Sequence, residues 1–463
     1  MRIGEPASVH VPEEGRASWL RGWELLILMA VAFLLFAPVL RVSLLSDDHQ
    51  VVWRTGAMGV GGGAGFFRPL TDLTIAWGYA VHGPLAAGHR APNIAVHGLN
   101  AWLMLLLARR WTRPSAGARI AWPAVALFLV FPSHFEPVIW IVGRGAALAT
   151  LFMLVVLLVL GSSLPDRWRV WLSAGAWSLG ALCYETALLL PLLLLPLMWW
   201  RVPVAWPPLR GCLPAWGAAF VLHFAWRAMA MGSLLDEGSY GGSFFSHSLG
   251  DYIANVPKVM ARLFIPPHPD TAVQTWRIAA ALLVLALVIG PWLWREARAR
   301  VPDHLLFAVL WSLAVTCIMP MIAGVSTRTT ESDRFLYMPS VFVSLLVAMA
   351  LARIANNRIR AGVLAVLLAV SVLLILDGQR AWLSASRITE RIVATMPGPP
   401  PGGRLLVTGL PDNIRGAYVF RNGFYEALLL AGRDTARVVK VPLDAELEVR
   451  PGDMVWPAGT VTE

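Results

Sequence analysis

Long apolar runs, separated by short polar segments, recur along most of this chain. An apolar run of about 18 or more residues is long enough to cross the hydrocarbon core of a bilayer as a helix. We therefore expect about eleven membrane-spanning helices, near residues 23–45, 92–109, 120–132, 138–160, 168–183, 186–200, 211–230, 276–295, 304–323, 335–352 and 360–377. The pattern predicts an all-α polytopic membrane protein.

The composition fits a membrane protein better than a soluble one. Hydrophobic residues make up 57% of the chain and charged residues 14%, whereas soluble domains carry roughly 25% charged residues. The formal net charge is +10, but the arginines are scattered over short loops between apolar runs. That scatter argues against nucleic acid as a partner.

The arginines predict how the chain is oriented in the membrane. Short basic loops stay in the cytoplasm, and with eleven spans every short loop on one side is basic, including those that hold Arg109, Arg201 and Arg353. The first apolar run is too long for a signal-peptide core, so we expect an uncleaved anchor with a cytoplasmic N-terminus. We expect the protein to lie in a bacterial inner membrane. The segments expected outside the cytoplasm are 46–91, 133–137, 184–185, 231–275, 324–334 and everything after 377.

Domain organisation follows from loop length and composition. The outer loops 46–91 and 231–275 are too long to be simple connectors, and within the first loop residues 70–81 resemble a helix on the membrane surface. We expect a transmembrane domain over 1–379 and a small extracytoplasmic α/β domain over 380–463. For the second domain we predict an amphipathic segment at 382–395, a strand at 405–407, a helix within 416–430 and a strand pair over 438–449.

Asp47 and Asp48 lie at the outer end of the first predicted span. One carboxylate of such a pair can act as a general base while its neighbour raises its pKa or orients the acceptor. The alternative is a solvated helix end. Adjacent aspartates rarely chelate one ion alone, so we expect no metal, and we expect no cofactor. The three cysteines lie in or beside apolar runs, so we expect no disulfide.

A second group of polar residues follows the third predicted span. His134 and Glu136 precede a helix in which Glu136, Trp140 and Arg144 are spaced by four and would share one face. An arginine inside a membrane helix needs a partner. That partner is either Glu136 or a lipid phosphate, which guanidinium binds in bidentate fashion.

Further charged residues fall on the same predicted side. Arg68 and Arg334 are candidate phosphate ligands, although Asp333 and Arg334 could also form a structural charge pair. Glu185 lies at a hairpin tip. Lys258 and Arg262, one helical turn apart, could meet a phosphate or anchor the loop to lipid headgroups.

Taken together, these motifs resemble the GT-C superfamily of membrane glycosyltransferases. The resemblance is closest to the O-mannosyltransferase branch whose eukaryotic members carry tetratricopeptide repeats, and to its bacterial relatives. It covers residues from about 23 to 350. The matching motifs are Asp47-Asp48, Phe67-Arg68-Pro69-Leu70, the block from His134 to Arg144, Tyr184-Glu185, and the block from Asp333 to Ser340.

The resemblance implies a donor sugar carried on a polyprenyl phosphate and an acceptor hydroxyl outside the cytoplasm. It implies that Asp47, with Asp48 as runner-up, is the catalytic base and that the transfer inverts the anomeric centre. By the same argument three arginines would hold the donor phosphate: Arg144, Arg334 and Arg68. Substrate contacts are expected from His134, Glu136, Glu185, Lys258 and Arg262.

The chain also departs from the family pattern. Tetratricopeptide repeats are absent from the sequence, and Pro132 precedes His134 instead of lying between it and the acid. The acceptor is therefore left open among protein, glycan and lipid. Two other classes stay open: a lipid or glycan transporter or flippase, and a non-catalytic membrane scaffold.

Overall fold

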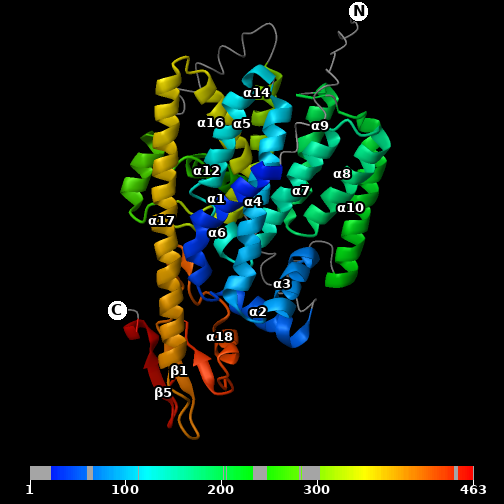
Figure 1. Cartoon of the computed structure of the whole chain (residues 1–463). Helices are drawn as coiled ribbons and strands as arrows, with labels where there is room; N and C mark the ends of the chain where they lie inside the picture. The colour runs from blue at the N-terminus through cyan, green and yellow to red at the C-terminus, as the bar shows by residue number, and fades with distance from the viewer. Residues whose placement is uncertain are drawn as a thin grey trace, which may run out of the picture.

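The computed structural model describes residues 22–59, 66–112, 114–201, 203–204, 206–232, 248–280, 283, 303–442 and 447–461. A helical bundle lies above a small domain that contains the strands (Figure 1). The helix α17, Asn357–Thr395, is 39 residues long and runs beside the bundle and into the small domain (Figure 1). The predicted spans 23–45 to 211–230 and 304–323 to 360–377 overlap helices, whereas 276–295 lies mostly outside the described residues.

The bundle is built from helices that run up and down its length. They are α1 (Gly22–Phe36) continued by the 3-10 helix η2 (Ala37–Arg41), α4 (Ala86–Trp111), α5 (Pro114–Leu129), α7 (Arg144–Leu160), α8 (Asp166–Ala181), η3 (Glu185–Leu189) with α9 (Leu190–Trp200), α10 (Leu209–Met231), α14 (His304–Thr316) with α15 (Ile318–Ala323), and η5 (Asp333–Leu336) with α16 (Tyr337–Ala352). The remaining labelled helices are α2 (Asp47–Met58), α3 (Pro69–His82), α6 (Phe135–Ile139) and α12 (Leu249–Arg262). Of these, α2 and α3 lie at the end of the bundle next to the small domain (Figure 1).

Five of the described helical segments are long and apolar enough to cross a membrane. They are Gly22–Arg41, Ala86–Trp111, His304–Ala323, Asp333–Ala352 and Asn357–Thr395. The polytopic helical class is therefore confirmed, while the count of eleven spans stays a prediction. The helix predicted at 70–81 is present as α3.

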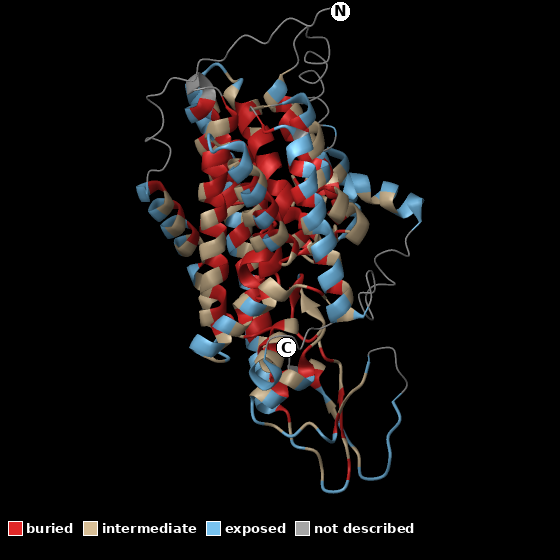
Figure 2. Ribbon diagram, turned by 90° about the vertical axis from the view of Figure 1, so that its right-hand side faces the viewer, coloured by how far each residue is buried: buried red, intermediate tan, exposed pale blue. Residues whose placement is uncertain are grey.

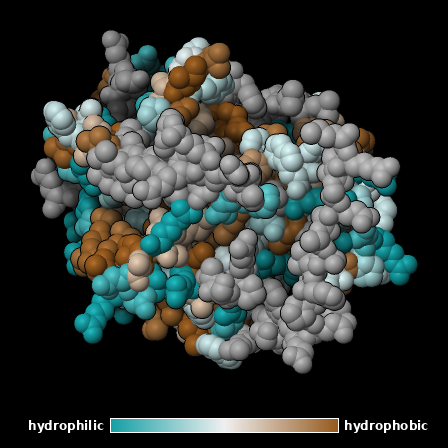
Figure 3. Space-filling model, turned by 90° about the horizontal axis from the view of Figure 1, so that it is seen from above, coloured by the Kyte–Doolittle hydropathy of each residue, from teal (hydrophilic) through white to brown (hydrophobic). Residues whose placement is uncertain are grey.

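Burial is concentrated on the bundle axis. Figure 2 shows buried residues in its middle and exposed residues toward its outside. The core side chains of α4, α5 and α16 pack here, among them Leu105, Phe128 and Phe342. The described surface at the end opposite the small domain carries hydrophilic and hydrophobic patches side by side (Figure 3).

The structure corrects the helix predicted over 138–160. α6 ends at Ile139, Trp140 has an extended conformation, and α7 begins only at Arg144. A Cβ added to Gly143 would lie 2.1 Å from the carbonyl oxygen of Glu136, so the chain folds back on itself where a side chain has no room. The prediction that Glu136, Trp140 and Arg144 share one helix face is therefore wrong.

The small domain contains a three-stranded parallel sheet in the order β4-β1-β5. Its elements are β1 (Leu405–Thr408), β2 (Asn413–Ile414), β3 (Ala417–Tyr418), α18 (Phe424–Leu430), β4 (Val438–Lys440), β5 (Met454–Pro457) and η6 (Ala458–Val461). β2 and β3 form an antiparallel hairpin.

Two of the predicted elements of this domain are confirmed, namely the strand at 405–407 and the helix within 416–430. The strand pair over 438–449 is wrong, because β4 pairs in parallel with β1 and the third strand is β5. Residues 443–446 of that range lie outside the described residues. The segment 382–395 belongs to α17 instead of forming a separate element, and the domain boundary at 379/380 stays a prediction.

Candidate active site

The start of α2 is held in an unusual backbone conformation. Ser46, which precedes Asp47, has φ 49° and ψ −122°. Non-glycine residues rarely adopt positive φ, and such positions are over-represented at functional sites. The small domain holds this turn, because the Ser46 amide donates to the Val419 carbonyl at 3.0 Å and the Asn422 amide donates to Ser46 Oγ at 3.2 Å.

Asp47 is partly exposed and lies among cationic groups. The Asn422 side chain donates a hydrogen bond to it, and the guanidinium groups of Arg334 and Arg421 are close enough to act on its charge. Burial nevertheless raises the pKa of Asp47 above its ordinary value of 3.8, against the effect of Asn422 and the two arginines. The result is a partly exposed carboxyl group that is more basic than usual and is influenced by two cations.

Asp48 has a different environment. Its side chain is fully buried and pairs with Arg90, with 3.3 Å between Oδ2 and Nη2. The backbone amides of Ile141 and Val142 donate to Oδ1 at 3.0 and 3.4 Å. Arg90 also donates to the carbonyls of residues 42, 43 and 139, so the pair ties α4 to the segments on either side. Asp48 thus positions the start of α2.

The buried Asp48 carboxyl predicts a pH-dependent stability. Burial raises its pKa from 3.8 to about 7, although Arg90 opposes this. Between those values the folded protein binds a proton more tightly than the unfolded chain. Stability therefore falls as pH rises through this window, by at most about 1.4 kcal/mol per pH unit. Unfolding measured across the window should show a smaller slope for Asp48→Asn than for the wild type, and equal slopes would contradict the assignment.

Glu136 links the bundle to the small domain. Its buried Oε1 accepts from the Ser332 amide at 3.0 Å and from the Tyr418 hydroxyl at 2.6 Å. Oε2 accepts from the backbone amide and the Nη1 of Arg334, both at 3.0 Å. Burial raises the pKa of Tyr418, and the charge of Glu136 raises it further, so its hydroxyl stays a donor.

Arg334 and Arg68 both contact Tyr184. Arg334 Nε donates to the Tyr184 hydroxyl at 3.0 Å, and the Arg68 guanidinium lies 4.2 Å from the centre of the Tyr184 ring. Arg68 forms a bidentate pair with Glu185, whose shortest distance is 2.8 Å. The predicted residues Arg68, Glu185, Arg334 and Glu136 therefore meet in one network, although the structural pair expected between Asp333 and Arg334 does not form.

The small domain adds a third arginine. Arg421 pairs with Glu331 at 2.8 Å and with Asp412 at 2.5 Å, and its guanidinium lies 4.8 Å from the Tyr418 ring centre. The charges of Arg334 and Arg421 act on Asp47, and the charge of Arg334 acts on Arg68. We call Asp47, these three arginines, Glu136 and Tyr418 the Asp47 cluster.

Four predicted site residues have other partners. Arg144 is buried and donates to Asn93 Oδ1, Thr74 Oγ1 and the His89 carbonyl. His134 is buried among aromatic rings, with its Nε2 2.8 Å from Ser340 Oγ. Lys258 and Arg262 do not share a partner. Arg262 forms a buried pair with Asp333, whereas Lys258 is exposed and donates to Asn255.

Sequence reasoning missed Arg90, Tyr418, Arg421 and Asn422. Arg90 lies in the first turn of α4, next to a long apolar run, and that position could have marked it. The other three lie in the small domain, where the sequence carried no recognised motif.

The fold is similar to that of solved membrane glycosyltransferases, so the resemblance to the GT-C superfamily that the motifs predict is confirmed at the level of the fold. No family model matches the chain. Among solved structures, it is similar to ArnT from Cupriavidus metallidurans in the apo state, at 14% identity and a TM-score of 0.54, with 91% of this chain and 86% of that chain covered.

Two further comparisons cover smaller shares of the related proteins. The arabinofuranosyltransferase AftD from Mycobacteria matches at 17% identity and a TM-score of 0.50, over 90% of this chain and 32% of that chain. The protein O-mannosyl-transferase Tmtc1 of Drosophila melanogaster is 29% identical over 180 residues. That match spans 34% of this chain and 21% of the relative.

Proposed function

We propose that this protein is a glycosyltransferase that moves a sugar from a polyprenyl-phosphate donor to an acceptor hydroxyl, with inversion. The observation that carries the proposal is the position of Asp47. In a GT-C fold, this partly exposed carboxylate follows a positive-φ serine and lies beside Arg334 and Arg421. A base next to two cations suits a reaction in which a hydroxyl loses a proton and a phosphate leaves.

The residues then take distinct roles. Asp47 accepts the proton of the acceptor hydroxyl, whose oxygen attacks the anomeric carbon as the bond to the phosphate oxygen breaks. Arg334 and Arg421 stabilise the charge on the leaving phosphate, with Arg68, which also contacts Tyr184, as a third cation. Glu136 holds Arg334 in place, and Asp48 positions α2. We assign Arg144, His134 and Arg262 to structural positions.

We further propose that the Asp47 cluster and the small domain lie outside the cytoplasm of a bacterial inner membrane. The helix ends that carry Arg109, Arg201 and Arg353 lie at the end of the bundle opposite the small domain (Figure 1). Basic loops are retained in the cytoplasm, so this arrangement supports an extracytoplasmic site.

The proposal is tested by donor turnover. The full chain in detergent is incubated with radiolabelled polyprenyl-phosphate mannose, chosen first because the Drosophila relative is named an O-mannosyl-transferase. Candidate acceptors are a Ser/Thr-rich peptide, a glycan extract and a lipid extract. We expect release of polyprenyl phosphate together with labelled acceptor. Failure with mannose and with other hexose and pentose donors, in a protein that remains folded, would overturn the proposal.

A further inference from the structure

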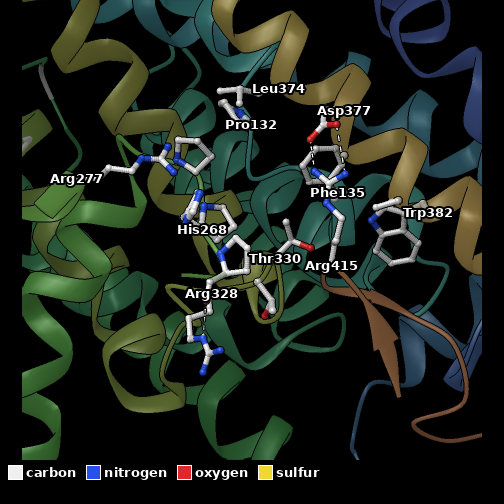
Figure 4. A pocket seen from close by; sticks show the side chains of 16 residues that line it. Pro132, Phe135, His268, Arg277, Arg328, Thr330, Leu374, Asp377, Trp382 and Arg415 are labelled. Atoms are coloured by element: carbon white, nitrogen blue, oxygen red, sulfur yellow. Dashed lines mark hydrogen bonds and ion pairs between the residues drawn. The ribbon is translucent and has the colours of Figure 1, made fainter. Parts of the chain in front are cut away.

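A cavity of about 640 Å³ lies on the side of α17, between the bundle and the small domain (Figure 4). α17 supplies one wall with Leu374, Asp377 and Trp382. Phe135 closes part of the cavity, and a Cβ added to Gly378 would lie 2.1 Å from its ring. Gly378 therefore lets α17 approach the ring closely. The other walls come from the prolines 266, 267 and 269 and from residues 328–330.

The lining of this cavity is cationic. Arg277, Arg328 and Arg415 line it from three separate segments, and Asp377 is the only acid among the described residues that do so (Figure 4). Arg415 pairs with Asp377, but their side chains are 60% and 47% exposed, and such exposed pairs contribute little stability. An anion can therefore compete for Arg415. Guanidinium groups match phosphate oxygens in geometry as well as charge.

An apolar surface leads to the cavity along α17. Other parts of the protein bury only 6% of the most apolar segment of this helix. Its exposed residues include Val363, Val366, Val370 and Leu373. The first acid after this stretch is Asp377, at the cavity itself. A ligand that fits both features has an apolar chain and a phosphate at its end.

We propose that this cavity binds the phosphate of a lipid whose chain lies along the apolar surface of α17. The site is distinct from the Asp47 cluster. Phe135 and Trp382 line the cavity. Their neighbours belong to that cluster: Glu136 follows Phe135 in the chain, and Tyr418 packs edge-on against Trp382. The lipid is either a polyprenyl phosphate or a membrane phospholipid, and both present the same group to the arginines.

Native mass spectrometry of the full chain in detergent tests this proposal. The probes are a polyprenyl phosphate, the corresponding polyprenol, phosphatidylglycerol and inorganic phosphate. We expect one or both phosphate-bearing lipids to bind more tightly than polyprenol and inorganic phosphate, and the preferred lipid identifies the source. The Arg277→Gln, Arg415→Gln double variant should bind that lipid about tenfold more weakly or worse.

Two further variants keep the test independent of folding. Arg380→Gln removes an exposed arginine of α17 that is not among the residues lining the cavity, and it should leave binding unchanged. Asp377→Asn removes the lining acid and frees Arg415, so binding should tighten, an outcome that misfolding does not produce. Equal binding of polyprenol, or unchanged binding in the double variant, would overturn the proposal. Arg421→Gln, which removes a cation proposed to hold the donor phosphate and does not line this cavity, should keep the binding that the double variant loses, which separates this site from the proposed transfer reaction.

Discussion

Asp47→Asn should lower the rate of sugar transfer by about 10²- to 10⁴-fold, the range typical for losing a general base. Asparagine keeps the shape of the side chain, and Asp47 is only partly buried, so the fold and donor binding should be retained. The readouts are transfer rate, donor binding and thermal midpoint, measured on the same purified sample. A variant that keeps more than a tenth of the wild-type rate would exclude Asp47 as the base.

Asp48→Asn is the matched control for this experiment. It removes the same charge one residue away, but from a fully buried carboxyl that pairs with Arg90. Its main effect should be on stability, with a smaller loss of rate at temperatures where the protein is folded. The pH profile adds a second check: the Asp47 carboxyl must be ionised to accept a proton, so the rate should fall on the acid side at a pH above 3.8, because burial raises this pKa. If Asp48→Asn lowers the transfer rate more than Asp47→Asn does, the base is Asp48.

The sequence was sufficient to predict which segments meet at the site. The predicted spans place every loop that carries Arg68, Glu136, Glu185 or Arg334 on the same side as Asp47. The structure brings these residues into one network. Topology alone therefore predicted the composition of much of the candidate site.

The sequence was not sufficient to distinguish neighbouring residues or to predict local geometry. Asp47 and Asp48 have the same side chain, and only the position of Arg90 against the latter shows which one is buried. The break between α6 and α7 depends on the close approach of Gly143 to the Glu136 carbonyl, which helical spacing does not reveal. Arg144 therefore begins α7 and does not share a helix face with Glu136, which lies in α6.

The contribution of the small domain depends on contacts between distant parts of the chain. Tyr418 and Glu136 are 282 positions apart and share a hydrogen bond. Asn422 contacts the Ser46–Asp47 turn across a longer separation, 376 positions from Ser46. A hydropathy pattern contains no signal for such pairs. The consequence is that the candidate site includes residues of the small domain.

Glu136→Gln should destabilise the protein by about 3 kcal/mol, the size expected when one partner of a largely buried ion pair is removed. Glu136 accepts from two backbone amides, a tyrosine hydroxyl and Arg334. An amide side chain has one acceptor oxygen, so its NH₂ group would face donors and leave them unsatisfied. Arg334 would also lose the carboxylate that holds it, so transfer should fall with stability.

Glu331→Gln is the matched control, because it removes the same charge from an ion pair that is only partly buried. Glu331 contacts Arg421, whose guanidinium keeps Asp412 as a second partner, so the expected loss is about 1 kcal/mol or less. Both variants are compared by thermal unfolding and by limited proteolysis of the small domain. Glu136→Gln should expose that domain to protease, because its carboxylate accepts the Tyr418 hydroxyl. If instead the two variants are equally stable and equally resistant, Glu136 does not join the small domain to the bundle, and the role proposed for Arg421 at the site loses its structural basis.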